Sequence, residues 1–336
     1  MRRLLAPVVL AVLLAGCSGS DAPEPPSTTA CNGHDELCGR AYDEVAYAAT
    51  HNSMSAAAEP GWFAPEQPEG IIAQLDHGVR VLLVDSWYGQ STERRGIVAT
   101  ADGSRPDALD QARADFGRRT VDIALRVRSA LGLEPTGEVR PYLCHALCEL
   151  GSTSWSRSLR DMKAWLDAHP REVVTLFVQD EVTPLDTARV IRDAGLEPYV
   201  YTPAEDGSWP TLGEMVDAGT RLVVLMENED GGTAIPWLIP GFEVVQDTPY
   251  LFESPADFTC VANRGPADAP LFLVNHWIDD WRHVPQNSEL VNARDVLLPR
   301  LEECAEERGQ LPNFVAVDYY DRGDLLAVVD ELNGVD

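Results

Sequence analysis

The sequence predicts a single-domain α/β protein, a (β/α)8 TIM-type barrel that is distorted or incomplete where its runs are weak. Three observations lead to this fold class. Short apolar runs alternate with stretches of helical spacing along the chain. The runs are almost continuously apolar, which is typical of parallel strands buried on both faces. The turn after the first run, Thr50-His51-Asn52-Ser53, lacks the glycines of an open doubly wound sheet.

Most of the candidate strands end beside a polar residue. The seven stronger runs are 45–50 before His51, 79–84 before Asp85, 142–144 before His145, 173–178 before Gln179 and Asp180, 221–226 before Glu227, 271–274 before Asn275, and 314–317 before Asp318. A weaker run at 199–202 is the candidate eighth strand. Because the carboxyl ends of barrel strands meet at one mouth, we expect these polar residues to converge there.

Helical spacing fills the intervals between the runs. Leu159, Met162 and Leu166 share one face of a helix that ends before Pro170. Pro184 opens the next helix, and 288–307 has the pattern of a long amphipathic helix. Between the second and third strands, 101–135 predicts a helical insertion that covers the mouth.

The N-terminus predicts export. Two arginines precede an apolar run at 4–14, and Leu13-Leu14-Ala15-Gly16-Cys17 resembles the cleavage site of a bacterial lipoprotein. Residues 1–17 are therefore a predicted signal, with Cys17 lipidated and anchored to the outer face of the cell membrane. The alternative is an ordinary cleaved signal and a secreted protein. Residues 18–40 are a predicted flexible tether, and the barrel follows at 41–336.

Six cysteines remain after Cys17, and an even number in an exported chain predicts disulfides, although six allow fifteen pairings. Proximity favours Cys31–Cys38 and Cys144–Cys148, which leaves Cys260–Cys304. The rival interpretation is a zinc site at Cys144, His145 and Cys148. It lacks a second ligand pair at the usual spacing.

Charge excludes one class of partner. The formal net charge is −28, and no stretch rich in Lys and Arg is present to neutralise a nucleic-acid backbone. The same charge opposes attachment to an anionic bilayer by charge alone. Membrane contact is therefore expected through lipidated Cys17.

Two histidines at strand ends are the candidate acid and base. Imidazole titrates near neutral pH, so His51 and His145 could transfer protons across the mouth. In a closed barrel the last strand lies beside the first, which places Asp318 next to His51 as its orienting carboxylate. The alternatives are that each histidine is structural and that Asp318 caps a turn or meets Arg322.

Oxygen donors at the strand ends suggest a cation. Asp85, with Asn52, Gln179 and Asp180, forms an oxygen-rich set that suits Ca²⁺ or Mg²⁺. The alternative is that these acids cap the following helices. Aromatic residues that follow strand ends are candidates for lining a sugar or lipid pocket: Trp87, Tyr88, Trp277, Trp281, Tyr319 and Tyr320.

Several segments together resemble one family. Thr50-His51-Asn52-Ser53 and the segment 81–87, which contains Asp85, stand in the order of the X region of phosphatidylinositol-specific phospholipase C. Tyr142-Leu143-Cys144-His145 follows, as the second-histidine segment does in that family. Segment 165–176 looks like the secreted fungal and plant proteins with this domain. The resemblance covers roughly residues 41–325.

The resemblance implies a role for each matching residue. His51, oriented by Asp318, would take the proton of the inositol 2-hydroxyl, and the freed oxygen would attack phosphorus to give a cyclic phosphodiester. His145 would protonate the departing diacylglycerol oxygen. Leu83 and Gln179 stand where the metal-dependent branch carries acids, and Asp85 stands where the metal-independent branch carries an arginine. A Ca²⁺ site at Asn52 and Asp85, with Gln179 or Asp180, is the expectation.

The predicted function is a phosphoric diester hydrolase that acts on a phospholipid or inositol phosphodiester. Two alternatives stay open. The first is a phosphodiesterase for another head group, such as a glycerophosphodiester, a sphingolipid or a glycolipid. The second is a lipid-anchored binding protein that has lost activity.

Overall fold

The computed structural model describes residues 29–101, 110, 113, 117–133, 135–145 and 147–335. The predicted signal at 1–17, including Cys17, and the tether as far as residue 28 lie outside the described residues. Within the described part of the chain, no helix is both long and apolar enough to cross a bilayer.

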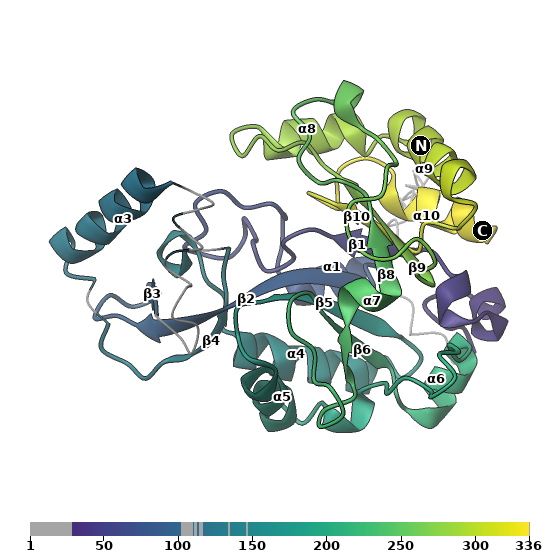
Figure 1. The fold of residues 1–336 in the computed structure, drawn as a ribbon, viewed down its shortest axis with the longest axis horizontal. Helices are drawn as coiled ribbons and strands as arrows, with labels where there is room; N and C mark the ends of the chain where they lie inside the picture. The colour runs from purple at the N-terminus through teal and green to yellow at the C-terminus, as the bar shows by residue number, and fades with distance from the viewer. Residues whose placement is uncertain are drawn as a thin grey trace, which may run out of the picture.

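Eight parallel strands curl into an open barrel (Figure 1), which confirms the predicted fold class. They are β1 (Tyr47–Thr50), β2 (Val81–Ser91), β5 (Val174–Asp180), β6 (Leu222–Met226), β7 (Leu238–Pro240), β8 (Val245–Asp247), β9 (Leu271–His276) and β10 (Phe314–Val317). The hydrogen-bonded order is β7-β6-β5-β2-β1-β10-β9-β8. Among the described residues β7 and β8 do not pair, so the barrel has one open seam.

Two of the predicted barrel strands are not strands of the barrel. Residues 142–144 overlap β4 (Arg140–Leu143), which runs antiparallel to β2 with Tyr142 opposite Trp87. At 199–202, Val200 makes only an isolated bridge to Leu222 after the 3-10 helix η4 (Glu197–Tyr199). The strands that take their places, β7 and β8, have three residues each. Runs this short carry no readable period.

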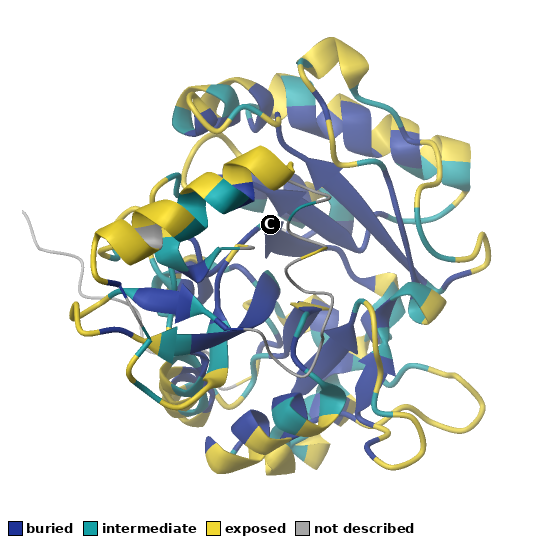
Figure 2. Cartoon of the chain, turned by 60° about the vertical axis from the view of Figure 1, so that its left-hand side comes forward, coloured by how far each residue is buried: buried dark blue, intermediate teal, exposed yellow. Residues whose placement is uncertain are grey.

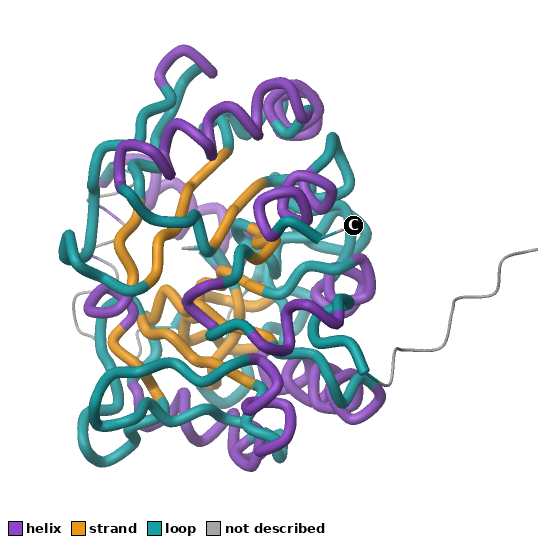
Figure 3. Tube along the Cα trace, turned by 90° about the vertical axis from the view of Figure 1, so that its right-hand side faces the viewer, coloured by secondary structure: helices purple, strands orange, loops and turns teal. Residues whose placement is uncertain are grey.

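The helices lie outside the strands (Figure 3). They are α1 (Ile71–His77), α3 (Arg118–Ala130), α4 (Trp155–Ala168), α5 (Pro184–Asp193), α6 (Leu212–Ala218), α7 (Gly241–Val244), α8 (Val284–Val291), α9 (Arg294–Arg308) and α10 (Leu325–Asn333). The predicted face of α4 is buried, and Thr183 caps α5 by accepting the Asp186 N–H. The helix predicted at 288–307 is two helices, because the chain breaks between α8 and α9.

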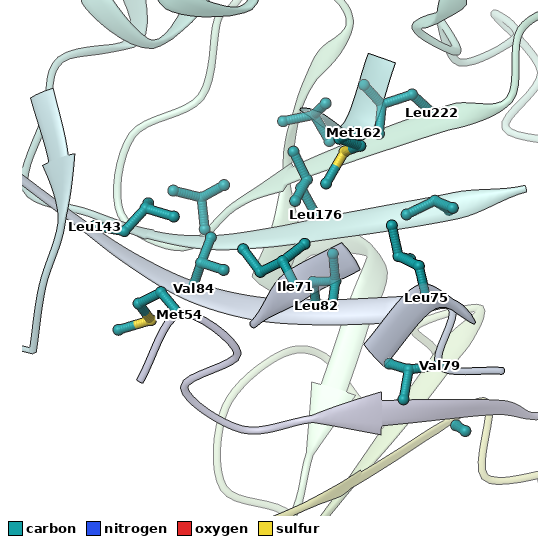
Figure 4. Close-up of a cluster of buried hydrophobic side chains, with 14 of the residues drawn as sticks. Met54, Ile71, Leu75, Val79, Leu82, Val84, Leu143, Met162, Leu176 and Leu222 are labelled. Carbon is teal, nitrogen blue, oxygen red and sulfur yellow. The ribbon is translucent and has the colours of Figure 1, made fainter. Parts of the chain in front are cut away.

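Alternate strand residues face two hydrophobic cores. One lies between the sheet and the helices, where Leu82 and Leu176 pack with Leu75 of α1 and Met162 of α4 (Figure 4). The other fills the barrel, with Ala49, Phe177, Leu225, Leu273 and Ala316 among its residues. At the amino end of the strands, Tyr42, Tyr47 and Phe314 close this interior with their rings.

The segment between β2 and α4 projects from the barrel as an arm. β2 continues beyond the barrel and pairs with β3 (Val98–Thr100) and β4 at the left of Figure 1. Helix α3 belongs to this arm and is largely exposed (Figure 2). The insertion at 101–135 was expected to cover the mouth. None of its described residues lines the cavity there, and most of 102–116 lies outside the described residues, so this expectation stays a prediction.

The packed domain begins earlier than residue 41. Cys31 and Leu37 are buried, and Asp35–Gly39 forms the 3-10 helix η1, followed by η2 (Tyr42–Glu44). Arg171 Nε donates to the Ala30 carbonyl at 2.8 Å, and the Val173 N–H donates to Asn32 Oδ1 at 2.7 Å. Residues 30–40 are therefore part of the fold at the amino end of β5, whereas the prediction placed them in the tether.

The disulfides are Cys31–Cys38, Cys144–Cys148 and Cys260–Cys304. All three predicted pairs are confirmed. The rival zinc site loses its thiolates, because Cys144 and Cys148 are bonded to each other. The remaining 3-10 helices are η3 (Cys148–Leu150) and η5 (Pro255–Asp257).

Candidate active site

A cavity of about 530 Å³ opens at the carboxyl end of the strands. Five of the seven predicted site residues line it: His51, Asn52, Asp85, His145 and Gln179. A sixth, Asp318, contacts His51. The strand ends thus converge as expected for a parallel barrel.

His51 and Asp318 form a pair because β1 and β10 are neighbours in register. Thr50 lies opposite Val317, so the next residue of each strand emerges at the same level. His51 Nδ1 lies 2.9 Å from Asp318 Oδ1, and its ring stacks on Trp277 at 3.9 Å between centroids. With Asp318 on Nδ1, Nε2 is the nitrogen left for the cavity side, where it meets Asn52.

The backbone after β1 is held by a side chain that was not predicted. Gln67 Nε2 donates to the carbonyls of His51 at 2.7 Å and Val317 at 3.0 Å, tying the two strand ends together. Asn52 follows with φ of 44°, a left-handed conformation that asparagine tolerates better than most residues. This turn directs the Asn52 side chain into the cavity.

His145 comes from the loop after β4. Its Nδ1 lies 3.1 Å from Asp85 Oδ2 at the point where β2 leaves the barrel, and half of its side chain is exposed. The Asn52 amide lies between the imidazoles, with Nδ2 3.1 Å from His51 Nε2 and 2.9 Å from His145 Nδ1. Two histidines, each with its own carboxylate, therefore face each other across one asparagine.

Neighbouring carboxylates raise the pKa of both imidazoles. Burial disfavours the charged form of His145, but the hydrogen bond and charge of Asp85 outweigh it and raise its pKa to about 9. Burial likewise opposes the charge on His51, and Asp318 and Glu66 overcome it, so the pKa of His51 also lies above its ordinary value. At neutral pH the raised pKa keeps His145 protonated.

Glu66 is a site residue that the sequence did not reveal. It lies in the long turn between β1 and α1, and its carbonyl accepts the Tyr319 N–H at 2.8 Å. Burial raises the pKa of its carboxyl to about 7, while the positive fields of His51 and His145 oppose this. No sequence pattern marks it, because its position depends on the path of a loop.

The opposite wall of the cavity is an ion cluster beside the open seam. Arg264 pairs with Glu227 at the end of β6 and with Asp247 at the end of β8, the latter at 2.6 Å. Its guanidinium also lies over the rings of Phe242 at 4.1 Å and Tyr250 at 4.8 Å. Arg264 stands in a loop and was not predicted; Glu227 had been recognised as a polar strand end.

Two polar residues at strand ends, the predicted ligand Asp180 and His276, lie apart from the cavity walls. Asp180 is fully buried, and its two carboxylate oxygens accept the N–H groups of Asn228 at 2.8 Å and Glu229 at 3.0 Å. His276 is enclosed between Arg300 and the Val291 carbonyl, and burial lowers its pKa to about 3. The geometry gives both residues structural tasks.

The donor set fits a resident Ca²⁺ poorly. Of the predicted ligands, Asp85 is the one carboxylate at the cavity, and its oxygen contacts His145. Asn52 contacts the two imidazoles through Nδ2, so it could offer a cation its single amide oxygen. Within the described chain, no group of three or more His, Cys, Asp or Glu side chains is placed to hold a metal ion. Calcium usually takes six to eight oxygen ligands.

Comparison with known proteins gives the class. The family model PI-PLC X 1 matches residues 133–333 of this chain. The PI-PLC X domain-containing protein 1 of Arthroderma benhamiae is 25% identical over 91% of this chain and 90% of its own length. An uncharacterized secreted protein of the same fungus is 26% identical over 94% of this chain, which covers 66% of that protein.

A solved structure shares the fold. A point mutant of the phosphatidylinositol-specific phospholipase C from Staphylococcus aureus matches with a TM-score of 0.50 and 12% identity, over 89% of this chain and 94% of that one. The fold and the site thus define an α/β barrel of the phospholipase C type. The chain belongs to the PI-PLC X domain family.

Proposed function

We propose that this protein cleaves a phosphoric diester by general acid–base catalysis, with His51 as the base and His145 as the acid. One observation carries the proposal: two histidines, each bound to its own carboxylate, face one cavity, and both have a pKa above the ordinary value. Membership of the PI-PLC X family supports the reaction class.

The base half of the reaction begins at His51 Nε2. Asp318 holds the proton on Nδ1, so Nε2 can accept the proton of a substrate hydroxyl next to the phosphate. The freed oxygen attacks phosphorus and forms a cyclic phosphodiester. Trp277, stacked on the ring, restricts rotation of the imidazole away from this position.

The acid half uses the protonated His145. Its Nδ1 side is occupied by Asp85, and the proton on Nε2 is available for the oxygen of the departing alcohol. The P–O bond breaks as this proton moves, so no alkoxide is released. The protons that His51 accepts and His145 donates balance, and water can later open the cyclic product by the reverse roles.

The charge on the phosphorane needs a partner. Asn52, whose Nδ2 lies beside His51 Nε2 and His145 Nδ1, and the imidazolium of His145 are the polar groups proposed to meet it. Since the donor set fits Ca²⁺ poorly, the proposed mechanism does not require a metal. We expect turnover to persist in EGTA, and loss of turnover in the chelator would show that Asp85 and Gln179 rearrange around a cation.

The substrate class proposed here is a lipid or inositol phosphodiester, following the family. We also propose that the protein is exported: a relative is a secreted protein, and three disulfides suit an oxidising compartment. Attachment through lipidated Cys17 remains a prediction. Mass spectrometry of membrane fractions, with Cys17→Ala as the comparison, would test it.

The test of function is phosphorus NMR of phosphatidylinositol vesicles with the purified domain, with and without EGTA. A cyclic inositol phosphate signal in both tubes is expected, and its absence in His51→Ala and in His145→Ala would show that both histidines are required. No new phosphorus signal with the unmodified protein would reject phosphatidylinositol. If neither the unmodified protein nor the variants turn over substrate, but all of them bind the ligand, the binding-protein alternative is favoured.

A further inference from the structure

The two histidines are held in different ways. His51 continues a barrel strand, and its neighbours Thr50 and Asn52 are buried. His145 stands in a loop between β4 and η3, and its side chain is half exposed. The barrel itself therefore fixes one histidine but leaves the other to its loop.

That loop is closed by a disulfide. Cys144 immediately precedes His145 and bonds to Cys148, four residues along. Both sulfurs are buried, with residues 0% and 2% exposed, and they pack with Trp87 of β2 and Val98 of β3 in one small cluster. His145 thus lies on a short covalent ring whose two ends are anchored in an apolar site.

Main-chain bonds dock this ring on the arm. The Cys144 N–H donates to the Asp85 carbonyl at 3.1 Å, and the Cys148 N–H donates to Thr100 Oγ1 at 2.9 Å. Within the ring, the Leu147 N–H donates to the His145 carbonyl at 2.6 Å. The residue that accepts from Cys144 is the same Asp85 whose carboxylate contacts the imidazole.

We propose that the Cys144–Cys148 disulfide is a positioning element for the general acid, which holds His145 against Asp85 in line with the leaving group. This inference rests on the proposed function. An open loop of this length has many backbone states, and the covalent ring removes most of them. A displacement of about 1 Å at a catalytic group can lower a rate about a hundredfold.

Leaving-group chemistry separates this role from a merely structural one. A general acid matters when the departing alkoxide is strongly basic, and it matters little when a nitrophenolate departs unprotonated. Loss of overall stability would lower both rates together. The probes are two myo-inositol 1-phosphate diesters, one with an alkyl and one with a p-nitrophenyl leaving group.

The variant is Cys144→Ala/Cys148→Ala, and the matched control is Cys31→Ala/Cys38→Ala at the other end of the barrel. We expect kcat on the alkyl diester to fall about tenfold or more with KM little changed, and kcat on the nitrophenyl diester to fall less than about threefold. The control variant should lower both rates equally or neither. Equal losses in the 144/148 variant, or no loss, would overturn the proposal.

Two further measurements keep the outcome decisive. Thr100→Val removes the acceptor of the Cys148 N–H without touching the disulfide, so it should give a smaller loss with the same leaving-group selectivity. If the double variant does not fold, a Thr100→Val variant with equal losses would reject the inference. His145→Ala is the reference: if it also loses both rates equally, the assignment of the acid in the proposed function has failed instead.

Discussion

At the scale of single residues, each imidazole of the candidate site has its own carboxylate partner. Asp318 is almost fully buried beside His51, whereas Asp85 meets an imidazole that is half open to solvent. Both carboxylates favour the charged imidazole, and the effect on His145 is large enough to carry its pKa to about 9. The rate should therefore rise as His51 loses its proton and fall as His145 does.

The acidic limb of the pH profile belongs to His51. In Asp318→Asn the partner that raises the pKa of His51 is gone, so the neutral imidazole persists to lower pH and the acidic limb of kcat/KM moves down. The rate at the optimum should also fall about 10²- to 10⁴-fold, because the tautomer is no longer fixed. Asp321→Asn, which removes a surface partner of Arg322, is the control and should leave the profile in place.

Glu66 should couple both limbs. Its carboxylate raises the pKa of His51 and of His145, so Glu66→Gln should move the acidic and the alkaline limb to lower pH together. NMR titration of the two imidazoles measures this directly, without substrate. Glu69→Gln, on the exposed part of the same turn, should shift neither. A change in the pKa of one imidazole alone would show that Glu66 affects only that imidazole.

At the scale of elements, the seam between β7 and β8 is bridged by side chains. Arg264 joins Glu227 of one flank to Asp247 of the other, and the Asn275 amide donates to the same Asp247 oxygen at 3.2 Å. Asp247 is fully buried, so its charge depends on these partners. At this seam an ion cluster therefore links the two flanks of the sheet, whereas main-chain hydrogen bonds link neighbouring strands elsewhere.

Removing this guanidinium should weaken the fold. Arg264→Met keeps the contact with Phe242 but leaves Asp247 without its cation, and we expect a loss of about 2–3 kcal/mol in the free energy of unfolding. The value lies below that of a fully buried pair because Arg264 is one-third exposed. Arg282→Met, at the exposed pair with Asp280, is the control and should cost less than about 0.5 kcal/mol. Equal losses in chemical denaturation would contradict the bridging role.

At the scale of the whole molecule, the disulfides tie together segments of different separation. Cys260–Cys304 spans 44 residues, and Cys31–Cys38 spans 7. Since the entropy removed from the unfolded chain grows with loop length, replacing the first pair with alanine should cost about 3–4 kcal/mol and the second about 2 kcal/mol. Urea unfolding of the two double variants measures the order. The reverse order would indicate that local packing, rather than chain entropy, sets the contribution.

How far the sequence predicts this molecule depends on what fixes each part. The partnership of His51 and Asp318 was predictable, because closure of a parallel barrel makes its first and last strands neighbours. His145 was placed at the mouth although its strand was assigned wrongly, since β4 is antiparallel and returns the chain to the point where β2 leaves the barrel. Arg264 and Glu66 escaped prediction, because long loops carry no period that fixes their path.

The first described residues pack at the end of the barrel that lies opposite the cavity. Ala30 and Asn32 are fastened to Arg171 and Val173, just before β5 begins, whereas the cavity opens where the strands end. The first described residues therefore lie at the amino end of the barrel, opposite the mouth of the cavity. A lipid on Cys17, as the sequence predicts, would therefore be joined to the barrel at the end opposite the candidate site.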